Sequence, residues 1–339
     1  MKKICFYLIV TVIAKTSCGQ DLTFSQFYEK PLLRNPALAG VFDGDIRISA
    51  VFRNQWQSIT TPFQTGALST EFKIPFNQNG DWITLGFEIT HDVAGDIKLK
   101  RTQLLPVVNF HKSLNGNADD YLSAAFMAGP VTSQFDPTLL QLDDQFQNGS
   151  FNPNNPTAQV FSHTAYTYWD ASTGLSYSSG FGEGARYYAG IGLFHFNAPK
   201  VSYYTNNSSS TLAPKFALNA GLTLPTGDAN KVMFYADYFT QGGNEQFLGG
   251  LMYRTDLATK YDTDEKVSLD FGGFYRWNDS FIPVVKLAVY EVSFGISYDV
   301  NVSRLQTASQ SRGGFEFTAS YRARVRKDAM AGKVRCTKF

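Results

Sequence analysis

The chain has 339 residues, of which 17% are charged and 15% are aromatic, and its formal net charge at pH 7 is +1. A net charge so close to zero excludes a broad electrostatic attraction to nucleic acid. The length fits one large all-β domain or two ordinary domains. Abundant aromatic rings are typical of a β-sandwich core and also of the interfacial belts of a membrane barrel.

The first 19 residues have the layout of a secretory signal peptide. Residues 1–3 are basic, residues 4–14 are apolar, and small residues at 17–19 precede a cut before Gln20. The apolar stretch is too short to span a bilayer as a helix. Of the three cysteines only Cys336 survives this cut, so the mature chain has no intrachain disulfide. We therefore predict an exported protein that begins at Gln20.

Residues 20–45 do not alternate between apolar and polar positions, and they are too long and too apolar for a free tail. Pro31 and Pro36 favour extended turns within this segment. We expect it to lie at the periplasmic rim or in the mouth of the barrel inferred below.

From residue 46 to residue 325 the chain alternates with a period of two, as in Val267, Leu269 and Phe271 against Ser268 and Asp270. Strands of this kind face two different environments. Most of the blocks are near the 9–11 residues that a tilted strand needs to cross a bilayer. The predicted strands are 46–54, 66–76, 82–91, 97–112, 119–130, 163–178, 185–197, 213–225, 231–240, 246–257, 266–277, 281–288, 291–301 and 313–325.

The connections alternate in length along the chain. Long connections at 55–65, 91–96, 131–162, 198–212 and 302–312 fall on one side, whereas 77–81, 113–118, 179–184 and 225–230 are short and rich in turn residues. This asymmetry is typical of a bacterial outer-membrane barrel with both termini in the periplasm. We predict an all-β fold, an antiparallel transmembrane barrel of about 14 strands, with a basic tail at 326–339.

We identify no catalytic, metal or cofactor site in the sequence. His91, His111, His163 and His195 are scattered, without the spacing of a metal site. A nucleophile elbow of the Gly-x-Ser-x-Gly type is absent. We therefore expect a protein that is not an enzyme and takes no cofactor.

Several motifs resemble the PorP/SprF family of outer-membrane barrels, which is tied to type IX secretion and gliding motility in Bacteroidetes. They are F-S-Q-F-Y at 24–28, P-L-x-x-N-P-A-x-A-G at 31–40, R-N-Q-W at 53–56, D-D-Q-F at 143–146 with F-N-P at 151–153, H-F-N-A-P at 195–199, S-Y-D-V-N-V-S at 297–303 and G-G-F-E at 313–316. Family members usually end in C-P-R-F, and this chain ends in C-T-K-F at 336–339.

The resemblance implies a component of the secretion machinery that supports export or surface retention of a secreted partner such as an adhesin. Its implied partners are the periplasmic ring, the peptidoglycan-linked components and the C-terminal domain of the cargo, with no nucleic acid. The partner-binding candidates are Phe24, Gln26, Phe27, Asn35, Pro36, Arg53, Trp56, Asp144, Phe146, Cys336 and Phe339. The alternative function is an outer-membrane channel or transporter for small solutes, and a soluble β-sandwich enzyme is a third interpretation.

Overall fold

The structure is a computed structural model that describes residues 21–324, except 58–59, 78, 116–119, 183, 206–209, 228, 261–264 and 305. The predicted signal peptide and the basic tail, with Cys336 and Phe339, lie outside the described residues.

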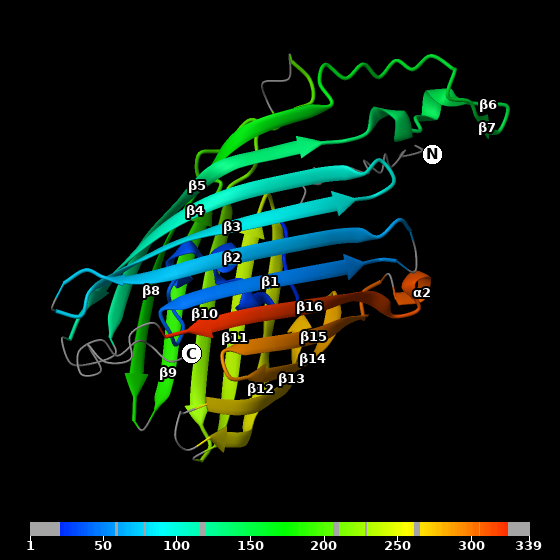
Figure 1. Cartoon of the computed structure of the whole chain (residues 1–339). Helices are drawn as coiled ribbons and strands as arrows, with labels where there is room; N and C mark the ends of the chain where they lie inside the picture. Colours follow the sequence, from blue (N-terminus) through cyan, green and yellow to red (C-terminus); the bar gives the residue numbers. More distant parts are fainter. Residues whose placement is uncertain are drawn as a thin grey trace, which may run out of the picture.

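Fourteen antiparallel strands form one closed barrel (Figure 1), as the sequence predicted. Each strand pairs with its neighbours along the chain, and the first and last strands close the ring from Ile46↔Ala323 to Gln55↔Gly314. The strands are β1 (Ile46–Gln55), β2 (Phe63–Pro75), β3 (Trp82–Ala94), β4 (Leu99–Ser113), β5 (Tyr121–Gln134), β8 (Ala165–Phe181), β9 (Ala185–Phe194), β10 (Lys215–Pro225), β11 (Asn230–Gln241), β12 (Asn244–Lys260), β13 (Glu265–Arg276), β14 (Ser280–Val289), β15 (Val292–Asn301) and β16 (Arg312–Ala323).

The alternation of the sequence sets which side chains point outward. On β15, Phe294 and Ile296 are 57% and 48% exposed, whereas Ser297 and Asp299 are each 3% exposed. The exterior is therefore apolar and the interior polar, which is the arrangement of a barrel whose outer surface meets lipid. Within the described ranges, no helix is long and apolar enough to cross a membrane.

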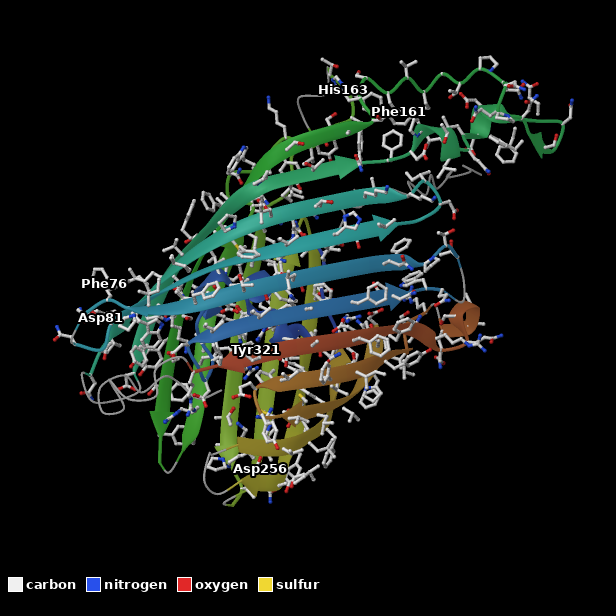
Figure 2. All side chains as sticks on the ribbon, in the orientation of Figure 1. Phe76, Asp81, Phe161, His163, Asp256 and Tyr321 are labelled. Atoms are coloured by element: carbon white, nitrogen blue, oxygen red, sulfur yellow. The ribbon has the colours of Figure 1, made fainter. Side chains whose placement is uncertain are left out.

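The two ends of the barrel differ. One end, the long-loop end, carries the connections 56–62, 135–164, 195–214 and 302–311, the last of which contains α2 (Gln306–Ser309). The opposite, short-turn end carries tight connections such as 226–229 and 290–291. Figure 2 labels Phe76 and Asp81 at the short-turn end and Phe161 and His163 near the long-loop end.

The longest connection, residues 135–164, projects from the barrel and is called the arm below (Figure 1). It contains η3 (Pro137–Leu139), η4 (Asp143–Gln145) and a small hairpin of β6 (Phe146–Gln147) and β7 (Ser150–Phe151). The Phe146 and Phe151 rings meet across this hairpin with centroids 5.5 Å apart.

Residues 21–45, called the thread below, lie inside the barrel. They contain η1 (Phe27–Glu29), α1 (Pro31–Arg34) and η2 (Pro36–Leu38), seen as blue coils behind β1 and β2 in Figure 1. Leu32, Ala37, Ala39 and Phe42 are fully buried. The expected position of this segment, at the periplasmic rim or in the barrel mouth, is therefore corrected: it fills the interior and reaches the short-turn mouth only at its last residues.

Candidate functional site

The thread runs through the barrel from the long-loop end to the short-turn end. Its outer end is held at Asp21, whose carboxylate lies 3.1 Å from Arg101 Nη1 and 2.9 Å from Lys215 Nζ. Arg101 lies near the start of β4 and Lys215 is the first residue of β10, so both belong to the long-loop end of the wall. The Asp21 backbone N–H also donates to Gln241 Oε1 at 3.1 Å.

Charged pairs hold the middle of the thread to three parts of the wall. Arg34 forms a two-pronged ion pair with Asp237 on β11, with N–O distances of 2.6 and 2.7 Å. Glu29 pairs with Lys286 on β14. The Lys30 ammonium donates to Ser49 O at 2.7 Å, on β1. All of these charges are buried, and each is satisfied only while the thread stays in place.

The inner end of the thread reaches the short-turn end. The Gly40 N–H donates to Glu71 Oε2 at 2.8 Å, and the same carboxylate forms a two-pronged pair with Arg47. Lys73 donates to Phe42 O, and Asp43 pairs with Arg324 just beyond β16. The described chain therefore begins at one end of the barrel and finishes at the other. The expectation that both termini are periplasmic concerns Gln20 and the tail, which lie outside the described residues.

Local sequence explains the shape of the thread. Pro31 and Pro36 stand at the first positions of α1 and η2, where a missing N–H costs nothing. Asn35 caps η2, its side-chain oxygen accepting from Ala37 N–H at 2.9 Å. Gly40 has φ +82° and lies against Thr84 and His111, so a side chain there would meet both strain and a clash.

Asn35 of the N-P-A motif packs against a part of the barrel wall where two inward positions are glycines. A Cβ added at Gly174 on β8 would overlap with the Asn35 amide oxygen, and one added at Gly190 on β9 would lie 2.7 Å from its amide nitrogen. Asn35 also donates to Leu175 O at 3.3 Å. These glycines therefore make the room that Asn35 occupies.

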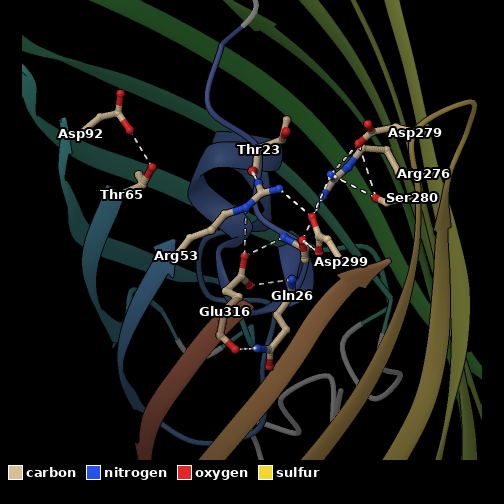
Figure 3. A network of polar contacts seen from close by, with 11 residues as sticks. Thr23, Gln26, Arg53, Thr65, Asp92, Arg276, Asp279, Ser280, Asp299 and Glu316 are labelled. Atoms are coloured by element: carbon tan, nitrogen blue, oxygen red, sulfur yellow. Dashed lines mark hydrogen bonds and ion pairs between the residues drawn. The ribbon is translucent and has the colours of Figure 1, made fainter. Parts of the chain in front are cut away.

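Four of the motifs meet in one polar network (Figure 3). The backbone N–H groups of Ser25 and Gln26 donate to the two oxygens of Glu316 at 2.8 and 2.7 Å. Arg53 donates to Thr23 O and, at 2.8 Å, to Asp299. Residues from the F-S-Q-F-Y, R-N-Q-W, S-Y-D-V-N-V-S and G-G-F-E motifs thus bind one another inside the barrel.

Two more groups complete the network. Arg276 at the end of β13 lies 3.1 Å from the Asp299 carboxylate and donates to Ser25 Oγ at 2.9 Å. Ser25 Oγ itself donates to Asp299 Oδ1 at 2.5 Å. Asp299 is therefore matched by two arginines and a hydroxyl, which is what a buried carboxylate needs.

The electrostatics of the thread favour its ionised side chains. Burial opposes the ionised form of Asp21, but attraction to Lys215 and Arg101 outweighs burial and brings the pKa of this carboxyl well below its ordinary value.

His195, just beyond β9, belongs to the same outer end. It lies 3.4 Å from the Asp21 carboxylate and 2.8 Å from that of Asp170. Burial lowers the pKa of His195, but these two carboxylates outweigh burial and raise it above the ordinary value. When it is protonated, the His195 imidazole adds a third cation beside Asp21.

A small cavity lies beside the thread. A cavity of about 50 Å³ lies between the thread residues Tyr28 and Glu29 and the wall residues Arg254, Asp270 and Arg322. Ser297 is 3% exposed on the inward face of β15 and pairs with Glu316, which binds the thread at Ser25.

The predicted partner-binding residues fall into three places. Phe24, Gln26, Phe27, Asn35, Pro36 and Arg53 are all buried inside the barrel. Trp56 lies at the long-loop end, stacked on Phe63 with ring centroids 6.2 Å apart. Asp144 and Phe146 are exposed on the arm, and Cys336 and Phe339 lie outside the described residues. The six buried residues hold the thread, so their expected direct contact with a partner is corrected.

Sequence reasoning missed the groups that tie the thread to the wall. Asp237 and Lys286 occupy inward positions of their strands, and Asp21, Glu29 and Arg34 lie in the thread. The sequence showed part of this, because a single charged residue at an inward position of a strand needs a partner inside the barrel. Among the described residues, no group of three or more His, Cys, Asp or Glu is arranged to hold a metal ion.

A closed antiparallel barrel with an apolar exterior and an occupied polar interior defines the class of outer-membrane β-barrel proteins. The chain matches the type IX secretion system membrane protein family PorP/SprF over residues 16–321. It belongs to this family, as its motifs indicated, and both the family and the fold are of a non-enzymatic kind.

Solved structures are similar in fold at low sequence identity. The CymD monoaromatic hydrocarbon channel is 11% identical, with 87% of this chain and 93% of that chain covered and a TM-score of 0.46. A Pseudomonas aeruginosa FadL homologue is 9% identical, with 85% and 92% covered and a TM-score of 0.45. CdiB from Acinetobacter baumannii is 8% identical with a TM-score of 0.41; 82% of this chain is covered, but only 60% of that chain. Comparison with curated proteins gave no match.

Proposed function

We propose that this protein is the outer-membrane component of a type IX secretion system that supports export or surface retention of a secreted partner such as an adhesin. The match to the PorP/SprF family over residues 16–321 carries this proposal. In it the long-loop end faces the cell exterior and binds the C-terminal domain of the cargo. The short-turn end and the tail, which lies outside the described residues, face the periplasmic ring and the peptidoglycan-linked components.

The arm is the part of the long-loop end best suited to bind cargo. It exposes apolar side chains, with Val160 75% and Phe146 47% exposed, beside the carboxylate of Asp144. Asp144 also accepts from Thr157 and from Ala158 N–H at 2.9 and 2.7 Å, which stiffens the distal half of the arm. A stiffened apolar surface loses less conformational freedom when a partner binds.

The channel alternative is disfavoured by the thread. A solute path through the interior requires the thread to leave, and that would strand buried charges such as Asp237 and Lys286. Planar-bilayer recording of the purified protein tests this alternative. A large, stable, solute-selective conductance of the intact protein would favour the channel.

Shortening the arm tests the secretion role. Residues 139–160 are replaced by a short Gly-Ser turn, and surface display of the cognate secreted protein is measured by antibody labelling of intact cells. We expect a folded, heat-modifiable barrel and loss of display. As the matched control, a Gly-Ser turn replacing 226–229 at the short-turn end should leave display intact. Normal display by the shortened arm would remove the arm from the proposal.

A further inference from the structure

The contacts at the two ends of the thread lie at opposite ends of the barrel. Asp21 binds the wall at the start of β4 and β10, Arg34 binds β11 in its middle, and Asp43 meets Arg324 beyond β16. Between these points Ser25 N–H donates to Glu316 and the Lys30 ammonium donates to Ser49 O. The thread thus connects the two ends of the barrel through its interior.

Covalent continuity fixes which way the crossing runs. Residue 45 leads directly into β1, whose first residue, Ile46, pairs with Ala323 at the short-turn end. The thread must therefore leave the barrel at that end, and its other end must lie among the long loops. At that end Asp21 binds two separate parts of the barrel wall, on β4 and on β10. Three strands lie between β4 and β10 in the ring.

From this geometry we propose that the amino-terminal end of the thread, at Asp21, opens to the outer face of the cell among the connections of the long-loop end. The carboxy-terminal end of the barrel, at Ala323, lies on the opposite side. The thread thus places residues near the signal cut where a bound surface partner would touch them. This inference shares with the proposed function only the outward orientation of the long loops.

The side chains around Asp21 favour its carboxylate at the long-loop end. Its carboxylate sits among Arg101, Lys215 and His195, and its side chain is only 13% exposed. Removing the carboxylate would leave the Arg101 and Lys215 cations without their shared anion, which is unfavourable away from water. A thread whose outer end slipped back toward the periplasm would lose this match.

An epitope followed by a protease site, inserted after Gln20, tests the proposal in intact cells. We expect externally added protease to remove the epitope almost completely. The same insertion after Asn148 in the arm should also be cut, and the one after Gly227 at the short-turn end should be protected. Heat-modifiable migration of each variant reports that the barrel has folded.

Two results would overturn the proposal. One is cleavage after Gln20 only in permeabilised cells while the arm site is cut in intact cells, because the amino terminus would then lie in the periplasm. The other is cleavage after Gly227 in intact cells with the arm site protected, because the barrel would then be inverted. If the Gln20 insertion prevents folding, Leu22→Cys in a Cys336→Ser background replaces it, with a membrane-impermeant maleimide as the probe. Labelling of intact cells supports the proposal, and labelling only after permeabilisation overturns it.

These results are distinguishable from a failure of the secretion role. Surface display of the secreted partner is measured separately, with the uninserted protein. Loss of the secretion role leaves the accessibility of the amino terminus unchanged, whereas an epitope reached only from the periplasm leaves surface display of the partner unchanged.

Discussion

Replacing Arg34 by Leu tests whether buried ion pairs fix the thread. The Arg34 and Asp237 side chains are 5% and 0% exposed, and Asn219 is a further donor to Asp237, at 2.9 Å. Without the guanidinium, Asp237 keeps a buried charge with one amide donor. Breaking one partner of such a pair costs about 3–5 kcal/mol of the free energy of unfolding. Arg34 also lies 4.8 Å over the Phe27 ring, and that contact is lost too.

The assay is urea unfolding of the barrel in detergent micelles, followed by the heat-modifiable band. The double variant Arg34→Leu/Asp237→Leu should recover most of the loss, since replacing both partners with apolar groups is often close to neutral. As the matched control, Lys266→Ala removes a half-exposed partner of Asp256 and should cost less than about 1 kcal/mol. If Arg34→Leu costs no more than the control, or the double variant is no better than the single one, the pair does not hold the thread.

Three other predictions follow from individual side chains. The pKa of His195 is raised, so its contribution to stability is full below pH 6.5 and is lost as the pH rises above that value. In unfolding titrations against pH, the difference between wild type and His195→Gln should therefore shrink above pH 6.5. Ile296→Arg on the lipid face should cost about 2–4 kcal/mol in the same urea assay, and Ser297→Arg should prevent recovery of a heat-modifiable band, because its side chain enters the occupied interior.

The barrel was predictable because the alternation that sets which side chains point outward is visible within each short stretch of sequence. On β13, Phe271 and Tyr275 point outward and Asp270 and Arg276 point inward, as the period of two required. Strand lengths were less predictable. β8 and β12 each have 17 residues, beyond the 9–11 that cross a bilayer, because some strands continue into the structure at the barrel ends.

The thread was unpredictable in position because its partners are distant in sequence. The sequence marked residues 20–45 as something other than a strand and as too apolar for a tail. Nothing local revealed that Glu29 pairs with a lysine 257 residues away or that Ser25 and Gln26 bind Glu316, 291 and 290 positions later. Such contacts arise only after the ring closes, since closure brings β1 beside β16.

The motifs that resemble the PorP/SprF family divide into two structural units. Those at 24–28, 31–40, 53–56, 195–199, 297–303 and 313–316 supply the interior bonds between thread and wall. Those at 143–146 and 151–153 bind one another in the exposed arm, where Asn152 N–H donates to Gln145 O at 3.2 Å. Among the described residues, no hydrogen bond or ion pair joins the two units, and distant sites contribute additively. A change in the arm should therefore alter cargo display without altering the free energy of unfolding, and a change such as Arg34→Leu should alter stability first.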